Sequence, residues 1–365
     1  MAPYPSNADE LFQHHILQGV SRTFALTIPQ LPHELHKAVA NAYLLCRIAD
    51  TLEDDSKLSF DQKVAYCKLF VSIVAVTEDA HQFSLTVPRE LGSHTSNEEK
   101  ELIARTETVI RVTHNLNESQ RAAMLRCVTK MTEGMILYQG TETLNGLKNQ
   151  NAMDRYCYYV AGVVGEMLTR LFCDYCSTLK TNQEEMMHLS VSFGQGLQMT
   201  NILKDIWTDR ERGACWLPAD EFSSRGIVLG ELDRTNKKEA FQEVLGSLIG
   251  SAHGHLHNAL TYTLMIPRCE VGIRRFCLWA LGMAILNLRK INANRSFSSG
   301  DQVKITRSAV KATVATTSLF TRSNLALKSL FQMASQGLPK NKVEIPMSSI
   351  ADIIDRSDES EKDSL

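Results

Sequence analysis

The stretch Asn41–Asp55 reads NAYLLCRIADTLEDD, and its periodicity decides the fold class. At about 100° per residue, Tyr43, Arg47, Asp50 and Asp54 share one face of an α-helix. The opposite face carries Ala38, Ala42, Leu45, Ala49 and Leu52. The stretch therefore predicts a helix that buries its small and apolar side and presents an aromatic ring, a cation and two carboxylates together. Taken alone, this pattern also fits a solvated charged face.

A second stretch, Gly194–Asp209, repeats the arrangement as GQGLQMTNILKDIWTD. Gln198, Asn201, Asp205 and Asp209 align on one helical face. The opposite face carries Leu189, Phe193, Leu203 and Trp207. Two helices that each present carboxylates at i, i+4 favour a magnesium site, because Mg²⁺ prefers oxygen ligands and bridges carboxylates to phosphates. The two stretches together predict a cavity that binds a magnesium-neutralised diphosphate.

The third stretch is Tyr156–Phe172, YCYYVAGVVGEMLTRLF. One helical face is predicted to carry Tyr156, Tyr159, Val160, Val163 and Met167. Gly162 and Gly165 lie inside this predicted helix, where each glycine costs up to ~1 kcal/mol relative to alanine. That cost favours a close helix–helix contact over the alternative, which is room for a ligand chain.

The composition agrees with helices throughout. The 365 residues include only 19 Gly and 9 Pro, fewer than average usage gives, and no proline lies between Pro88 and Pro218. Sheet-rich folds need frequent turns with these residues, so an all-α fold is predicted. We expect one helical domain over residues 1–346, followed by an acidic, disordered tail over 347–365.

Several functional classes are disfavoured. A net charge of −2 argues against a nucleic-acid partner. The chain lacks a nucleophile elbow, a Walker A loop and a GxGxxG dinucleotide fingerprint. No basic, apolar leader is visible, and the apolar run Phe276–Leu288 is shorter than the ~20 residues of a membrane span. We expect a cytoplasmic protein without a transmembrane segment, with peripheral membrane contact left open.

The chain resembles the squalene/phytoene synthase family, the head-to-head prenyl transferases, from Ser21 to about Val310. The resemblance rests on SRTF (Ser21–Phe24), RIADTLEDD, YCYYVAGVVG and QMTNILKDIWTDRERGACWLP. It implies an all-α barrel of the class I isoprenoid-synthase type, with a central cavity between two Asp-rich helices.

The resemblance also implies roles for individual residues. The implied metal ligands, which hold diphosphate through Mg²⁺, are Asp50, Asp54, Asp205 and Asp209. The implied catalytic set adds Tyr43, Arg47 and Tyr156, the last assisting proton removal or steering the cation. The implied substrate-binding set is Ser21, Arg22, Phe24, Val160, Val163, Gln198, Asn201, Arg212 and Phe276. Phe24 and Phe276 are implied aromatic walls, whose π faces stabilise carbocations.

The motifs DTLEDD and SRTFALTI are more similar to the squalene-forming members than to the carotenoid-forming ones. The segment Gln302–Val310 resembles the stretch that binds the NADPH phosphate, with Lys304 and Arg307 as its basic residues, although Thr306 stands where a further basic residue is common. ACWLPADEF, and Ala280–Leu281 in place of Pro-Gln, resemble the carotenoid branch instead.

The implied reaction condenses two farnesyl diphosphates to presqualene diphosphate and reduces it with NADPH to squalene. Two alternatives stay open at this point. One is a dehydrosqualene or phytoene synthase that omits the reduction. The other is a non-catalytic relative that acts as an assembly factor, which the two intact Asp motifs disfavour.

Overall fold

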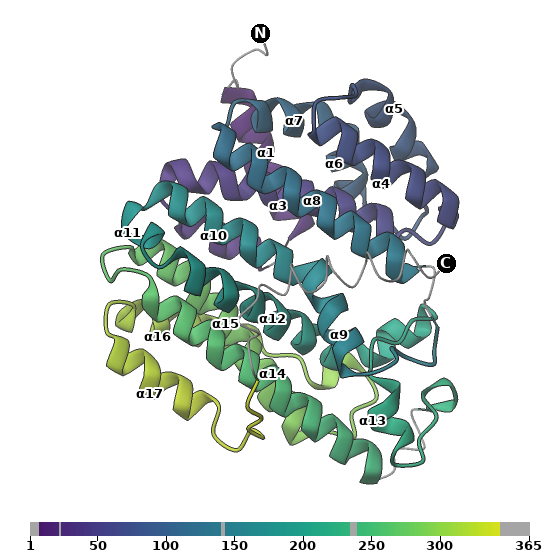
Figure 1. The fold of residues 1–365 in the computed structure, drawn as a ribbon, viewed down its shortest axis with the longest axis vertical. Helices are drawn as coiled ribbons and strands as arrows, with labels where there is room; N and C mark the ends of the chain where they lie inside the picture. Colours follow the sequence, from purple (N-terminus) through teal and green to yellow (C-terminus); the bar gives the residue numbers. More distant parts are fainter. Residues whose placement is uncertain (1–6, 22, 140–142, 234–238, 344–365) are drawn as a thin grey trace. The chain divides into compact units, whose positions relative to one another are not determined.

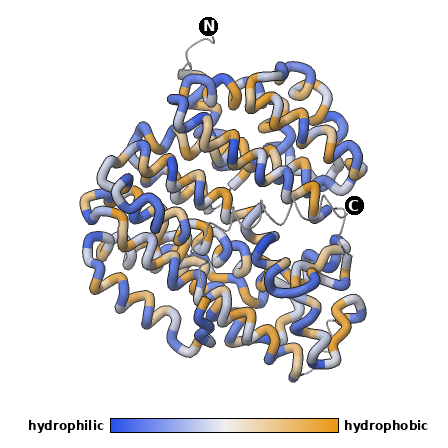
Figure 2. Tube along the Cα trace, viewed as in Figure 1, coloured by the Kyte–Doolittle hydropathy of each residue, from blue (hydrophilic) through white to orange (hydrophobic). Residues whose placement is uncertain are grey.

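A computed structural model describes residues 7–21, 23–139, 143–233 and 239–343 (Figure 1). Within these residues the regular structure is helical throughout, and the only extended pairing is an isolated bridge between Leu147 and Pro218. The predicted all-α class is confirmed. Figure 2 shows apolar and polar residues interleaved along the helices, as amphipathic helices require.

The chain forms two compact units, each of which is built from two separate segments. The first contains Met1–Thr141 and Glu166–Thr181, and the second contains Glu142–Gly165 and Asn182–Leu365. A single domain over residues 1–346 stays a prediction, and the tail 347–365 lies outside the described residues.

The first unit is built around α3. Its helices are α1 (Asn7–Val20), α2 (Phe24–Thr27), η1 (Ile28–Gln30), α3 (His33–Asp54), α4 (Phe60–Val74), α5 (His81–Glu90), α6 (Asn97–Ala104), α7 (Thr106–His114), α8 (Glu118–Gln139), most of α10 (Val163–Tyr175) and α11 (Ser177–Lys180). As predicted, α3 buries Ala38, Ala42, Leu45, Ala49 and Leu52. The helix packs among α1, α4, α6, α7 and α8. On its polar face, Tyr43, Arg47 and Asp50 are half-buried and Asp54 is exposed.

The second unit is built around α12. Its helices are α9 (Gln150–Cys157), the π-helical turn η2 (Tyr158–Gly162), α12 (Gln183–Glu211), α13 (Ala219–Ser223), η3 (Leu229–Glu231), α14 (Glu239–Met265), α15 (Val271–Ala293), η4 (Gly300–Gln302), α16 (Arg307–Phe320) and α17 (Asn324–Ala334). The predicted apolar face of α12, Leu189, Phe193, Leu203 and Trp207, is buried. It packs against α14, α15 and η2, which fixes the direction of the polar face.

The glycines of the third stretch serve close packing, as predicted. A Cβ on Gly165 would lie 2.2 Å from the Ser190 carbonyl oxygen, and one on Gly194 would lie 2.3 Å from that of Ala161. Backbone therefore touches backbone between α12 and the segment around η2, at a distance that no side chain tolerates.

The prediction of one regular helix over Tyr156–Phe172 is wrong. The π-helical turn Tyr158–Gly162 separates α9 from α10, so the 3.6-residue period does not continue through it. The extra residue in this turn rotates the side chains after it relative to Tyr156. Residue periodicity alone does not reveal such a turn. Ala161 and Gly162 in the turn lie against the backbone of Gly194 in α12.

The apolar run Phe276–Leu288 belongs to a longer helix than its sequence boundaries indicate. In the structure α15 covers Val271–Ala293, and it is the one described helix that is long and apolar enough to cross a membrane by length and composition. Of its most apolar window, 67% is buried inside the structure, as in the core helix of a globular unit. The sequence predicts no membrane-spanning segment. By length and composition, α15 is the one described helix that could form such a segment.

Candidate active site

In the first unit, the N-terminal SRTF motif packs onto the polar face of α3. The Ser21 hydroxyl accepts a hydrogen bond from the Phe24 backbone N–H at 2.9 Å, which starts α2. The Phe24 ring lies 5.1 Å from the Tyr43 ring, and the Tyr43 hydroxyl donates to the Val20 carbonyl at 3.0 Å. Burial raises the pKa of Tyr43, so its phenol stays protonated. The structure thus brings Ser21, Phe24 and Tyr43 together.

One turn further along α3, Arg47 lies between two carboxylates. It contacts Glu99 of α6 directly, and its Nη1 lies 3.8 Å from Asp50 Oδ2. Burial acts to raise the pKa of Glu99, but hydrogen bonds from Ser96 and the charge of Arg47 outweigh it and leave that pKa lowered. Glu99 is therefore an anion that holds Arg47, and the sequence analysis missed it.

Asp50 is the most perturbed carboxyl on this face. Burial raises its pKa to about 7; the charge of Arg47 opposes the shift, and the charges of Asp54 and Glu99 add to it. Its side chain is nevertheless 34% exposed, so it borders open space. Even with Asp50 partly protonated, three carboxyl groups beside one cation leave an excess of negative charge, and a bound divalent cation would favour the charged form of Asp50.

The two consecutive aspartates at the end of α3 have different surroundings. Asp54 is the last residue of the helix and is exposed. Asp55 is buried and accepts hydrogen bonds from the backbone N–H groups of Lys57, Leu58 and Gly92, and one from the Thr95 hydroxyl. Asp55 therefore anchors the following loops, whereas Asp54 lies exposed on the face of Asp50.

In the second unit, the predicted face of α12 is formed as expected. Gln198, Asp205 and Asp209 are half-buried, and Asn201 is exposed. Lys204, which the sequence analysis did not select, lies 3.1 Å from Asp205 Oδ2 and donates to the Asn201 amide oxygen at 3.4 Å. This face therefore combines two carboxylates with two amides and one cation. Arg212 follows as the exposed C-cap of α12.

Tyr156 is buried and stacks on Trp216, with ring centroids 4.1 Å apart and an interplanar angle of 5°. Trp216 lies 60 residues further along the chain, so residue periodicity does not reveal this pair. Val163 of α10 and Phe276 of α15 are buried, whereas Val160 is half-buried. That these residues line the path of a substrate stays a prediction.

The segment before Lys304 approaches the carboxylate face of α12. A Cβ on Gly300 would lie 3.2 Å from the Lys204 carbonyl oxygen and 3.4 Å from Asp205 Oδ1. Lys304 itself is 58% exposed and lies 3.6 Å from Asp301, and exposed Arg307 is the first residue of α16. Two exposed cations beside a helix N-terminus fit an anionic phosphate group. Arg22 lies outside the described residues.

The predicted magnesium ligands are the two aspartate pairs, Asp50 with Asp54 and Asp205 with Asp209. Both aspartate pairs offer the hard oxygen ligands that Mg²⁺ prefers. Across the described ranges, no group of three His, Cys, Asp or Glu side chains is close enough to hold a metal ion. A pair of aspartates therefore needs further oxygens, which water and the phosphates of a ligand supply in many magnesium sites. The convergence of both pairs on one diphosphate stays a prediction.

These features define an all-α protein of the class I isoprenoid-synthase type. The chain belongs to the squalene/phytoene synthase family, whose model matches residues 17–309. It is 29% identical over 296 residues to the squalene synthase of Schizosaccharomyces pombe and 28% identical over 286 residues to that of Homo sapiens. These matches cover 80% and 78% of this chain but only 61% and 64% of the relatives. The chain thus spans about three fifths of their length.

Solved structures show the same fold. The complex of TcSQS with the ligand E5700 superposes with a TM-score of 0.71 at 22% identity, and the match covers 90% of this chain and 92% of that one. A dehydrosqualene synthase superposes with a TM-score of 0.62 at 18% identity and covers 89% and 97%. Because both identities are low, these two likenesses support the architecture and do not distinguish the reactions.

Proposed function

We propose that the chain is a squalene synthase that condenses two farnesyl diphosphates to presqualene diphosphate and reduces this intermediate to squalene. The observation that carries the proposal is the pair of Asp-x-x-x-Asp helical faces, with the crowded carboxylate of Asp50 on one and Asp205 and Asp209 on the other. The similarity to fungal and human squalene synthases supports the squalene-forming branch.

Asp50, Asp54, Asp205 and Asp209 are the residues that would hold Mg²⁺. When bound, the metal neutralises charge on the diphosphate, which makes it a better leaving group. Arg47 already lies 3.8 Å from Asp50 and would add a fixed positive charge to the same region. The excess negative charge around Asp50 disfavours a bare diphosphate, so the metal-free face should not bind it.

The apolar part of the proposal concerns the cation that ionisation leaves behind. Phe24 and Phe276 would stabilise positive charge through their π faces without reacting with it. Tyr156, held flat against Trp216, would assist removal of the proton that the first condensation releases. Fixing this ring matters because a mobile phenol would sample positions from which it could trap the cation.

The overall reaction balances as two farnesyl diphosphates and one NADPH giving squalene, two diphosphates, NADP⁺ and a proton. NADPH supplies the hydride that ends the second stage. Lys304 and Arg307 would hold its phosphate, and the contact between Gly300 and Asp205 brings their segment against the carboxylate face. We place the protein in the cytoplasm with peripheral membrane contact, because its apolar product must leave to a lipid phase.

The test supplies purified full-length protein with farnesyl diphosphate and Mg²⁺, with and without NADPH, and identifies the lipid products. Squalene that forms only with NADPH is the expected result. Dehydrosqualene or phytoene in both reactions would overturn the reductive step, and no product at any metal concentration would favour the non-catalytic relative.

A matched set of variants links the activity to the two faces. Replacing Asp54 or Asp209 by Asn should lower turnover by about 100-fold or more, because each variant would lose a charged ligand of the metal that neutralises the leaving group. Asp61→Asn, on the exposed first turn of α4, is the control and should leave turnover unchanged. Near-normal turnover of Asp54→Asn at saturating Mg²⁺ would remove that residue from the site.

A further inference from the structure

The helical hairpin formed by α16 and α17 has an unusual surface for the end of a globular unit. At its tip, Leu319 is 77% exposed, Phe320 is 38% exposed, and Leu325 just beyond the turn is 78% exposed. Figure 1 shows the two helices side by side at the C-terminal end of the described chain. Three large apolar side chains within seven residues form a patch that water does not favour.

The charges on this hairpin have one sign only. Residues 302–343 contain seven basic side chains and no acidic one. The basic side chains are Lys304, Arg307, Lys311, Arg322, Lys328, Lys340 and Lys342. Arg322 lies in the turn between the three apolar residues and is exposed, as is Lys328 one turn into α17. The apolar patch therefore has exposed cations beside it. This local positive charge contrasts with the net charge of the whole chain, which is −2.

A buried cation lies at the base of the same tip. Arg274 of α15 is fully buried, and its Nη2 donates to the Asn324 side-chain oxygen at 2.6 Å, at the first residue of α17. Its Nε and Nη1 have no hydrogen-bond partner among the residues that the structure describes. Arg268 acts on Arg274 as a further positive charge. The positive charge of the tip is therefore continued inward instead of being neutralised there.

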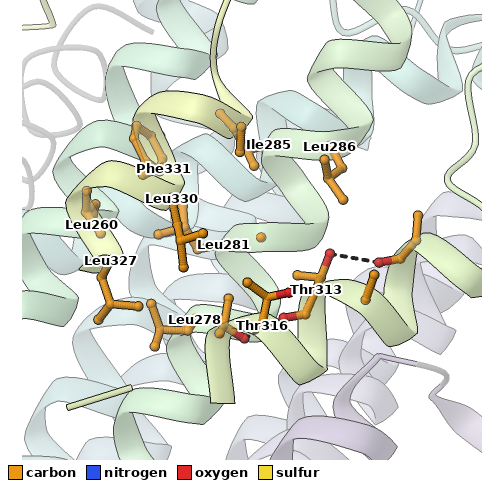
Figure 3. Close-up of a pocket in the computed structure, with 15 residues that line it drawn as sticks. Leu260, Leu278, Leu281, Ile285, Leu286, Thr313, Thr316, Leu327, Leu330 and Phe331 are labelled. Atoms are coloured by element: carbon orange, nitrogen blue, oxygen red, sulfur yellow. Dashed lines mark hydrogen bonds between the residues drawn. The ribbon is translucent and has the colours of Figure 1, made fainter. Parts of the chain in front are cut away.

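The inner face of the hairpin is also apolar, but it is incompletely packed. No residue of α16 is buried, and α17 buries only Leu327 and Phe331. Between the hairpin and α15 lies a pocket of about 320 Å³, lined by apolar side chains and threonine methyls (Figure 3). Two of the threonine hydroxyls, those of Thr313 and Thr317, donate to carbonyls of α16 itself. No residue of the candidate active site lines this pocket.

We propose that the tip of the α16–α17 hairpin docks onto an anionic lipid bilayer. Leu319, Phe320 and Leu325 insert at the headgroup level, and Arg322 and Lys328 lie against lipid phosphates. Basic side chains that flank exposed apolar ones give an element affinity for an anionic membrane surface. A protein partner would match this surface only if it were both acidic and apolar. A second copy of the chain that pairs through the same face brings the same positive charge, which repels it.

Membrane docking depends only on the exposed residues of the hairpin tip. It does not require that the protein catalyses the proposed reaction. Its use is tied to the proposed function, because an apolar C30 product released beside a bilayer avoids transfer through water. Membrane docking by the hairpin would hold the protein at a bilayer without requiring α15 to cross it.

The test measures cosedimentation of the full chain with vesicles of phosphatidylcholine, alone or mixed with phosphatidylglycerol. The wild type should bind the mixed vesicles, bind the neutral ones weakly, and dissociate at high salt. The triple variant Leu319→Ser/Phe320→Ser/Leu325→Ser and the double variant Arg322→Gln/Lys328→Gln should each lower the partition coefficient by about tenfold or more. Thermal unfolding by circular dichroism shows that each variant is folded.

The matched control is the triple variant Leu11→Ser/Leu85→Ser/Val228→Ser, which removes three exposed apolar side chains elsewhere and should bind as the wild type does. The proposal would be overturned if the wild type did not bind the mixed vesicles, or if the tip variants bound them as strongly as the wild type does. Concentration-dependent self-association that the tip variants abolish while vesicle binding is unchanged would also overturn it. Turnover measured in detergent separates the two proposals: normal turnover without vesicle binding contradicts only docking, and binding without product contradicts only the proposed function.

Discussion

The contact between the backbones of α12 and η2 predicts the effect of adding a single methyl group. In Gly194→Ala, the new Cβ would lie 2.3 Å from the Ala161 carbonyl oxygen and 2.6 Å from its carbonyl carbon. An ordinary contact of a Cβ needs 3.4 Å or more, so the two segments must separate by about 1 Å. Neither neighbour is a flexible side chain, and the strain therefore reaches both helices.

The magnitude follows from two opposing effects. Overpacking of a close contact costs up to about 3 kcal/mol, and the better helix propensity of alanine returns ~1 kcal/mol. We expect a net loss of about 2 kcal/mol in the free energy of unfolding. Because α12 carries Gln198 and α9 carries Tyr156 on either side of this contact, turnover should also fall.

Urea unfolding followed by far-UV circular dichroism measures the loss as a lower transition midpoint. Gly246→Ala is the matched control in α14, because its new Cβ would meet only the guanidinium end of the Arg295 side chain. That group can shift without moving backbone, and water can replace its hydrogen bonds to Gln242 and Asn292. We expect the control to stay within about 1 kcal/mol of the wild type. A Gly194→Ala midpoint equal to that of the wild type would refute the backbone contact between α12 and η2.

Three further predictions concern single side chains of the second unit. Trp216→Ala removes the ring stacked on Tyr156 and should lower both the melting temperature and turnover, whereas Trp216→Phe should restore most of each. Burial raises the pKa of Asp154 to about 6, above its unfolded value near 4. Between pH ~4 and 6 the folded state therefore binds more protons than the unfolded state does. The stability that this group contributes is fully present below pH ~4 and is lost as the pH rises through 6. Asp154→Asn should gain stability over the wild type, by about 1–3 kcal/mol, as the pH rises across that window in urea titrations. Burial lowers the pKa of His255, whose Nδ1 lies 2.8 Å from the Ser192 hydroxyl, to about 4. The unfolded state then binds more protons between pH ~6.5 and 4, so stability falls as the pH is lowered through this range, and His255→Gln should remove that dependence. For each of Asp154→Asn and His255→Gln, the free energy of unfolding is measured against pH. A curve parallel to that of the wild type would contradict the pKa shift assigned to that residue.

The two carboxylate faces could be predicted from sequence because each depends on one helix. Ala49 and Leu52 of α3, and Leu203 and Trp207 of α12, are buried at the positions that the 3.6-residue period selects. A helix with a defined buried side has a defined exposed side, and the aspartates follow from it. No long-range information is required for such a prediction.

The partners of these faces could not be predicted in the same way. Glu99 contacts Arg47 across 52 residues. The sequence of residues 96–99, SNEE, contains the capping box that starts α6, so Glu99 could have been selected as a helix-start residue. Its second contact depends on how α6 packs against α3, which local sequence does not encode. The π-helical turn after Tyr156 is likewise not visible in the residue periodicity, although it lies against Gly194 of α12.

The central claim is a reductive coupling of two prenyl chains, and hydride transfer tests it most directly. The full chain is incubated with farnesyl diphosphate, Mg²⁺ and NADPH that carries deuterium at the transferable C4 position, and the C30 product is analysed by mass spectrometry. The account predicts squalene that contains one deuterium per molecule. A C30 hydrocarbon formed at the same rate without deuterium would contradict it.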